Sequence, residues 1–195
     1  MSDTATRPRS RPGRPREYDE AAALSAALQV FWTRGYEATT LDDLTGAMGL
    51  SRSSFYSAFG SKEQVFLAAL SAYSEDALSA LSEIAHRPEG EPVDAMLAAL
   101  ADPQGGPRGC LLVNCITELA PHNDRVAAIG RRHIDRIEQL FAEALSPSDP
   151  AAAIDRARAL AALAIGTVTL RKSGLSPDAI SAALAQGRAL FASPQ

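Results

Sequence analysis

The sequence predicts an all-α protein of about nine helices, with a three-helix head at the N-terminus and a larger helical domain behind it. Apolar residues recur three and four positions apart along most of the chain, which is the spacing of one face of a helix. The chain is 46% hydrophobic but only 6% aromatic, a composition typical of helices rich in Ala and Leu. Helix-capping residues, glycines and prolines then divide the chain into separate helices.

The segment 40–62 contains two short helices joined by a tight turn and the start of a third. Thr40 and Asp43 have the spacing of a capping box, and Gly49 can end the first short helix in a left-handed conformation. Ser51 and Ser61 are expected to cap the next two helices. Two short helices joined in this way form a helix-turn-helix, whose second helix fits the major groove of DNA.

The second helix of this motif is polar on one side, while Phe55 and Phe59 mark the buried side. Arginine can read guanine, and hydroxyl groups can approach phosphates and base edges closely. Lys62 would meet a phosphate together with the free N–H groups of the next helix. The residues expected to contact DNA are Thr40, Ser51, Arg52, Ser53, Ser54, Tyr56, Ser57 and Lys62. The alternative is an ordinary surface helix pair with a serine-rich face.

Two helices flank this motif. The first is expected over 19–34 and ends at Gly35, and Trp32 near its end is expected to pack against the helix-turn-helix. A long helix from Ser61 to about Ala85 connects the head to the second domain. The predicted buried stripe of the first helix is Ala22, Leu24, Ala27, Leu28 and Phe31.

Residues 19–66 resemble the DNA-binding domain of TetR-type transcriptional regulators. The motifs that carry the resemblance are R-G-Y (34–36), T-T-L-D-D-L (39–44), A-M-G-L-S-R-S-S-F-Y (47–56) and F-G-S-K-E (59–63). The sequence departs from the family at Ser57 and Ala58, where many members carry aromatic residues or His, so Tyr56 and Lys62 are the contacts carried over. The resemblance implies a repressor that binds a palindromic operator and is released from it by a small-molecule or thiol-reactive effector. It also implies a homodimer formed through the last two helices.

The predicted domains are a disordered basic arm (1–17), the DNA-binding domain (18–64) and a ligand-binding and dimerisation domain (65–195). The run R-P-G-R-P-R (11–16) resembles an AT-hook, in which Arg14 and Arg16 would enter a narrow minor groove; the alternative is a solvated tail. Residues 1–62 hold eight basic and seven acidic side chains, and 63–195 hold eleven and sixteen. The acidic second domain would repel DNA, so any contact must use the N-terminal end.

Prolines and glycines divide the second domain into further helices. Residues 86–92 and 102–107 are expected to be loops, and 110–120 a short apolar helix deep in the domain. Asp149-Pro150 and Ser176-Pro177 are helix starts. The last five helices are expected near 93–101, 110–120, 123–145, 150–172 and 177–192. Small and apolar residues line one face of the penultimate helix and suit either a dimer seam or the core: Ala157, Leu160, Ala161, Ala164, Ile165 and Val168.

Cys110 is the strongest candidate for an effector-sensing residue. It lies near a helix start just after Arg108, and both features lower the pKa of a thiol. R-G-C-L-L-V-N (108–114) with T-E-L-A (117–120) resembles a branch of the family in which some members sense electrophiles or oxidants. Cys115 lies about 140° further round that helix, so the two thiols cannot pair within it. Lys172 could stabilise a thiolate if its helix end folds over Cys110. The alternatives to a thiol sensor are a regulator that binds a non-covalent ligand and one that has no effector. The alternative for the two cysteines is that both thiols are buried and inert. The alternative for Lys172 is a solvated cation at the end of its helix.

The remaining residues suggest neither catalysis nor a metal or organic cofactor. The three histidines, His86, His122 and His133, lack metal-ligand spacing, and no nucleophile–base pair can be assembled. No apolar run is long enough to span a membrane. An organellar transit peptide is an alternative interpretation of the Arg-rich leader, but the resemblance favours a bacterial cytoplasmic protein. The competing function is a helical ligand-binding or redox-active protein that binds no operator.

Overall fold

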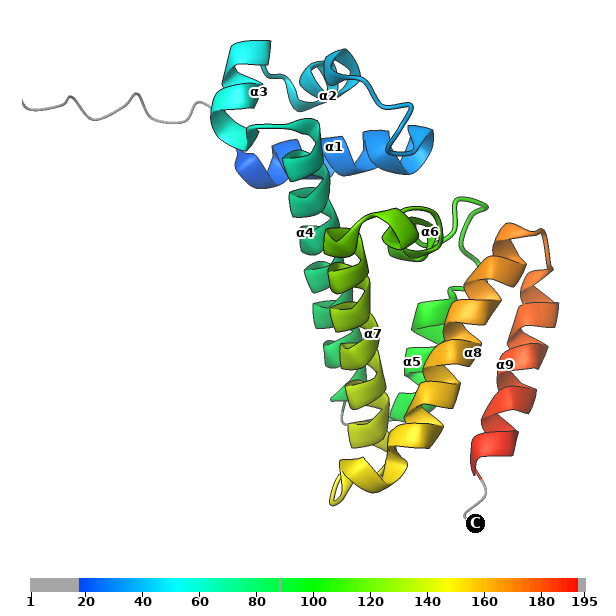
Figure 1. Cartoon of the computed structure of the whole chain (residues 1–195). Helices are drawn as coiled ribbons and strands as arrows, with labels where there is room; N and C mark the ends of the chain where they lie inside the picture. The colour runs from blue at the N-terminus through cyan, green and yellow to red at the C-terminus, as the bar shows by residue number, and fades with distance from the viewer. Residues whose placement is uncertain (1–17, 88, 193–195) are drawn as a thin grey trace, which may run out of the picture.

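The computed structural model describes residues 18–87 and 89–192, and within these ranges it contains nine α-helices, two short 3-10 helices and no strand. The predicted all-α class is therefore confirmed. Helices α1 (Glu20–Arg34), α2 (Leu41–Met48) and α3 (Arg52–Phe59) form a head at one end of the molecule. Helix α4 (Lys62–Ala85) runs from this head down into a second bundle, so the predicted boundary at residue 64 falls inside a continuous helix (Figure 1).

The local signals that define the helix-turn-helix are all present. The Thr40 hydroxyl accepts a hydrogen bond from the backbone N–H of Asp43 at 3.1 Å, and the Asp43 carboxylate accepts one from the N–H of Thr40 at 3.0 Å. Gly49 ends α2 with φ 65° and ψ 29°, the left-handed conformation that suits a residue without Cβ. Ser51 and Ser61 each accept a hydrogen bond from the N–H three residues further on.

The buried stripe of α1 differs from the predicted one by one position. Ala23, Ala27 and Phe31 are buried, whereas Ala22 is exposed. Residues four apart stay on one face of a helix, but adjacent residues are about 100° apart, which turns Ala22 away from the core. The other two stripe residues, Leu24 and Leu28, are half-buried at its edge.

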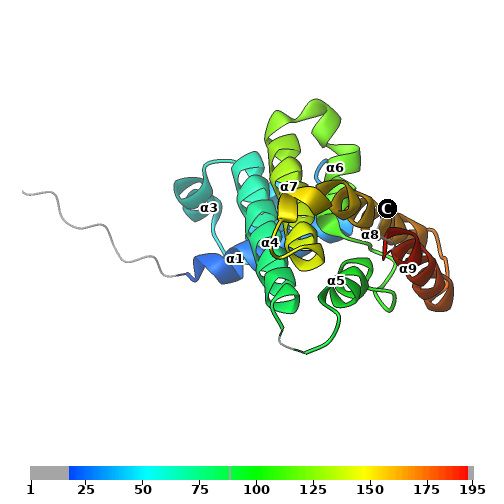
Figure 2. The same ribbon diagram turned by 90° about the horizontal axis from the view of Figure 1, so that it is seen from below.

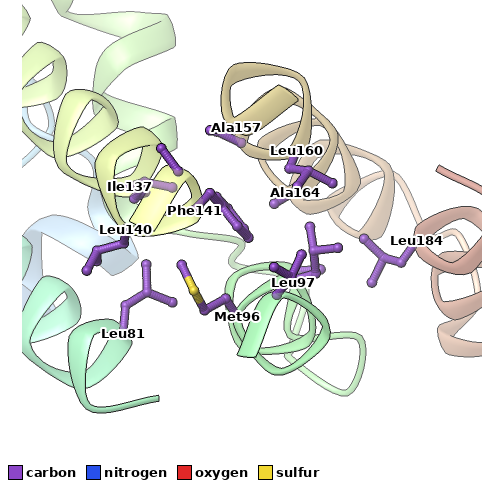
Figure 3. Packing of buried hydrophobic residues seen from close by; sticks show 14 of the residues in the cluster. Leu81, Met96, Leu97, Ile137, Leu140, Phe141, Ala157, Leu160, Ala164 and Leu184 are labelled. Carbon is purple, nitrogen blue, oxygen red and sulfur yellow. The ribbon is translucent and has the colours of Figure 1, made fainter. Parts of the chain in front are cut away.

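The second bundle consists of α4 with α5 (Pro92–Ala101), α7 (Asp124–Leu145), α8 (Ile154–Lys172) and α9 (Pro177–Ala192). Seen from below, α4 and α7 lie side by side, while α8 and α9 form the far edge (Figure 2). Its core is centred on Met96, Phe141 and Leu160, which are fully buried (Figure 3). Helix α8 is preceded by the 3-10 helix η2 (Pro150–Ala153), so the segment predicted as one helix over 150–172 begins with a tighter turn.

The small-residue face of α8 lies inside the protomer. Ala157, Leu160, Ala161, Ala164 and Val168 are each at most 4% exposed. Ile165 beside them is half-buried. Ala157, Leu160, Ala161 and Ala164 belong to the core cluster that α8 shares with α5, α7 and α9, which selects the core alternative for this part of the face over the dimer seam.

Helix α6 (Leu111–Glu118) lies across the top of the bundle, just under the head (Figure 1). It is shorter than the predicted 110–120 helix, because Cys110 is its N-cap and a 3-10 helix η1 (Ala120–His122) follows it. It also does not lie deep in the second domain. Its buried residues Leu111, Leu112 and Cys115 belong to the same apolar cluster as Phe31 and Phe66 near the head. Head and α6 therefore share one core.

Trp32 packs toward this junction and not against the helix-turn-helix as predicted. Its indole meets the ring of Tyr73 on α4 edge-on, with ring centroids 5.4 Å apart. The guanidinium of Arg108, in the loop before α6, lies 5.0 Å from the centroid of the indole. Trp32 therefore lies between α4 and that loop.

Candidate nucleic-acid interface and inner cavity

Helix α3 presents its polar side chains to solvent and its phenylalanines to the head. Phe55 is fully buried and Phe59 is half-buried, while Tyr56 is 55% exposed. The polar residues predicted to contact DNA from this helix and its cap are all exposed: Ser51, Arg52, Ser53, Ser54, Tyr56 and Ser57. This exposure leaves a surface of hydroxyl and guanidinium donors with no apolar side chain covering it.

Arg52 is held by Asp42, a partner that the sequence did not suggest. Its Nη2 atom lies 2.7 Å from Oδ1 and 2.9 Å from Oδ2 of Asp42, and its Nε atom lies 3.1 Å from Oδ1. The two side chains join the start of α3 to the first turn of α2. Both are largely exposed, so water screens the ion pair and an incoming phosphate or base can compete for the guanidinium.

The hydroxyl groups at the start of α3 form a small network of their own. The Oγ atom of Ser51 lies 3.0 Å from that of Ser53 and 2.9 Å from that of Ser54. The Thr40 hydroxyl is engaged in the α2 cap, where it donates to the Asp43 carboxylate at 2.7 Å. The hydrogen bonds from Thr40 and the nearby charge of Arg34 hold the pKa of Asp43 below its usual value.

Lys62 points back toward the loop between α1 and α2. Its Nζ atom donates to the backbone oxygen of Glu37 at 3.3 Å and lies 4.6 Å from the centroid of the Tyr36 ring. To make the predicted phosphate contact, the Lys62 ammonium group would have to leave these two partners for the phosphate. Arg14 and Arg16 of the predicted arm lie outside the described residues.

A cavity of about 110 Å³ lies between α6, α7 and α8 in the second bundle. Its wall is mainly aliphatic, so it favours an apolar ligand. The polar residues in the wall are Cys110, Thr117 and His133. The remaining lining residues are Leu100, Leu112, Val113, Ile116, Ile134, Ile137, Ala164, Ile165 and Val168.

His133 is the functional candidate that sequence reasoning missed, because its spacing to the other histidines carries no metal signal. It is buried, and its Nδ1 atom lies 2.8 Å from the hydroxyl oxygen of Ser74 on α4. Burial lowers the pKa of His133 to about 4, so the imidazole is neutral at pH 7. Its position between Ile129 and Ile137, four residues away on either side, is a signal that could have indicated a buried histidine.

Cys110 is half-buried and forms part of the cavity wall. Its Sγ atom lies 3.6 Å from the hydroxyl oxygen of Tyr73, and burial together with the nearby thiol raises the pKa of that tyrosine. Arg108 does not support the thiol in the predicted way. Its guanidinium lies over Trp32 and donates to the side-chain oxygen of Gln29 at 3.3 Å.

The two other predicted sensing residues have different surroundings. Cys115 is buried and unpaired, and burial raises the pKa of its thiol to about 12. Lys172 does reach the α6 region, where its Nζ atom donates to the Asn114 side-chain oxygen at 2.9 Å. The Asn114 side chain in turn donates to the backbone oxygen of Arg108 at 2.9 Å. Lys172 thus ties the end of α8 to the loop before Cys110 instead of contacting the thiol.

Within residues 18–87 and 89–192, no group of three or more His, Cys, Asp or Glu side chains could hold a metal ion. No helix there combines the length and the apolar character that crossing a bilayer requires.

Comparison with known proteins identifies the head. The sequence model of the family described as bacterial regulatory proteins, tetR family, matches residues 23–69. The HTH-type transcriptional regulator YezE of Bacillus subtilis is 33% identical over 136 residues, which are 66% of this chain and 69% of YezE. The HTH-type transcriptional repressor ComR of Escherichia coli is 36% identical over 129 residues, which are 62% of this chain and 61% of ComR.

The similarity extends to the whole fold. A cysteine mutant of the TetR family regulator CifR, solved with 26-bp operator DNA, superposes with a TM-score of 0.75 at 27% identity. The superposition covers 93% of this chain and 100% of the CifR chain, so head and second bundle match together. The family motif, the relatives and the helical arrangement agree: the chain belongs to the TetR family of bacterial regulatory proteins and is a transcriptional regulator.

Proposed function

We propose that the chain is a dimeric repressor that binds a palindromic operator through α3 and leaves it when a small molecule occupies the cavity. The donor-rich exposed face of α3 carries this proposal. Operator DNA bound to the structural relative CifR supports it. In this proposal residues 18–64 bind DNA and 65–195 bind the effector and the second subunit.

Each polar residue of the α3 face has a chemical role at DNA. Arg52 exchanges its exposed ion pair with Asp42 for guanine or a phosphate, both of which accept two N–H bonds from one guanidinium. The hydroxyl groups of Tyr56 and the serines donate hydrogen bonds to phosphates and base edges. Lys62 and the arm residues Arg14 and Arg16 supply positive charge that strengthens binding at low salt.

A second subunit is needed because one short recognition helix reads too few base pairs. Two half-sites about 34–36 Å apart place two such helices in successive major grooves. We propose that the outer faces of α8 and α9, at the edge of the bundle, form the contact (Figure 1). Gly166 is exposed there, and Leu170 and Leu190 are 45% and 79% exposed, so this face offers close approach and apolar area that the protomer leaves uncovered.

The cavity is the proposed effector site, and Cys110 gives it two modes of action. A ligand can fill the aliphatic space without reacting. A ligand with a conjugated carbonyl can also react: the thiol adds to its C=C bond, a C–S bond forms, and the thiol proton ends on the neighbouring carbon. Replacement of Cys110 by Ser separates the modes, because it abolishes only the second.

The route from the cavity to the head runs through three side chains. Cys110 contacts the Tyr73 hydroxyl, and the Tyr73 ring contacts Trp32 at the end of α1. Because α6 and the head share one apolar cluster, a displacement of α6 cannot leave the head packing unchanged. We propose that ligand entry moves Tyr73 and Trp32 and so changes the separation of the two heads.

An electrophoretic mobility shift with DNA from upstream of the protein's own gene tests the proposal. The parent protein should form a discrete complex, and Arg52→Ala should weaken it at least about tenfold, the effect of losing one bidentate base contact. Arg136→Ala is the matched control, because Arg136 is a partly exposed, ion-paired arginine on α7 of the second bundle. Absence of a complex at low salt, or equal effects of the two substitutions, would refute operator binding through α3.

A further inference from the structure

His133 is the least explained group in the cavity wall. Its side chain is 9% exposed, and it contributes to a cavity whose other lining residues are mostly aliphatic. Nδ1 is engaged with Ser74, and Nε2 has no hydrogen bond among the described residues. Nε2 is not one of the fully buried unpaired atoms in this part of the chain, so it keeps accessible surface that a ligand in the cavity can reach.

The Ser74 contact fixes which form of the imidazole faces the cavity. Ser74 is itself buried, its hydroxyl has one hydrogen to donate, and its only side-chain hydrogen bond among the described residues is the one with Nδ1. If Nδ1 carried the proton, the buried hydroxyl hydrogen would have no acceptor, which is the costlier arrangement. Ser74 therefore donates to Nδ1, and the proton of the neutral ring is on Nε2. The free position of His133 is a hydrogen-bond donor.

We infer that the cavity binds an uncharged carbonyl compound whose oxygen accepts a hydrogen bond from Nε2–H of His133. The inference rests on the proposed function, in which this cavity is the effector site, and adds the chemical class of the effector. A volume of about 110 Å³ suits a compound with a single ring. The aliphatic wall contacts the rest of the molecule, and His133 orients it through one polar atom.

The surroundings also exclude a carboxylate as the favoured ligand. The low pKa of His133, about 4, means that the ring brings no positive charge at pH 7. The two cations at the end of α8 are engaged elsewhere. Arg171 binds the backbone of Ala101 and Asp102, and Lys172 binds Asn114. A carboxylate in this wall would lose its water without gaining a counter-charge.

The test compares three ligands of one ring size by isothermal titration calorimetry: acetophenone, ethylbenzene and benzoate. None of them alkylates a thiol, so the result does not depend on Cys110. The parent protein should bind acetophenone about three- to tenfold more tightly than ethylbenzene, the contribution of one net hydrogen bond, and benzoate more weakly than both. His133→Phe should remove the preference for the ketone, and His133→Gln, which keeps an N–H donor, should restore part of it.

A purely structural role for His133 would instead weaken all three ligands alike. Equal binding of ketone and hydrocarbon by the parent, tight binding of benzoate, no binding of any of the three, or a ketone preference that survives His133→Phe would each overturn the inference. A mobility shift without ligand is run on the same proteins. Its failure would count against operator binding alone, because calorimetry reports on the cavity whether or not DNA binds.

Discussion

The indole of Trp32 lies edge-on against the phenol ring of Tyr73, at an interplanar angle of 70°. This contact joins the last turn of α1 in the head to the middle of α4. On its far side the Tyr73 hydroxyl meets the thiol of Cys110. The head and the cavity wall are thus two contacts apart.

Replacing Trp32 by Leu should leave operator binding intact and blunt the response to effector. Leu keeps an apolar side chain in the junction but cannot maintain the ring contact with Tyr73. If that contact carries the signal, the effector concentration for half-release should rise by roughly tenfold, within the usual range of allosteric coupling. N-ethylmaleimide titrations followed by fluorescence anisotropy of labelled operator measure it. An unchanged release curve, with N-ethylmaleimide still reacting at Cys110, would refute this route.

Asp42→Asn should tighten operator binding by releasing Arg52. The carboxylate holds the guanidinium in three hydrogen bonds in the free protein and also places a negative charge beside the DNA surface. The gain should be largest at low salt, because both side chains are exposed and salt screens them. Anisotropy at several salt concentrations measures it, with Asp155→Asn as the control remote from the head. Equal or weaker binding by Asp42→Asn would contradict the exchange of partners.

Arg171→Ala should destabilise the fold by about 2–4 kcal/mol. The buried guanidinium donates to the backbone oxygens of Ala101 and Asp102 at the end of α5. Its loss removes a donor from both, and the Asp102 oxygen then keeps only the N–H of Gly105. Arg188→Ala is the control, because Arg188 makes one partly exposed ion pair with Asp94 and should cost less than about 1 kcal/mol. Urea unfolding at pH 7 gives both values, and similar losses for the two variants would argue against a capping role for Arg171.

The stability of the protein should fall as the pH drops from about 6.5 toward 4 because of His133. The pKa of His133 is lowered from 6.5 to about 4 by burial, so in this window the unfolded chain binds a proton that the folded chain does not. The loss is at most about 3 kcal/mol. It should be absent in His133→Gln, so unfolding free energies of parent and variant should converge as the pH falls. Parallel pH curves would contradict the assignment.

Alkylation of the native protein should distinguish the two cysteines. Cys115 is buried and the pKa of its thiol is raised to about 12, so it has little thiolate at pH 8, whereas Cys110 is half-buried at the cavity wall. Iodoacetamide should therefore label Cys110 first, and Cys115 only after unfolding. Peptide mass spectrometry over a time course shows the order. Equal rates in the folded protein would remove Cys110 as the distinctive reactive thiol.

The helix boundaries of the head could be predicted because their causes are local. The Thr40 and Asp43 cap involves residues three apart, and the Gly49 turn needs only the missing Cβ. The exposed polar face of α3 follows in the same way from the positions of Phe55 and Phe59 on one side of a short helix. Such signals are complete within a few residues of sequence.

The partners in the cavity region could not be predicted because they come from distant parts of the chain. Ser74 and His133 are 59 positions apart, and Gln29 and Arg108 are 79 apart. Arg108 was expected beside Cys110 because they are neighbours in sequence, but the Trp32 face offers the guanidinium a cation–π contact. The small-residue face of α8 was ambiguous for the same reason, since a stripe of alanines does not specify what it packs against.

The DNA-binding head cannot be separated cleanly from α6, because one apolar cluster contains residues of both. Phe31 packs against Phe66 in the same cluster as Leu111 and Leu112, so a fragment cut after residue 64 would lose Phe66 and uncover Phe31. A chimaera that joins this head to the second bundle of another regulator would therefore also need α6 and the loop before it.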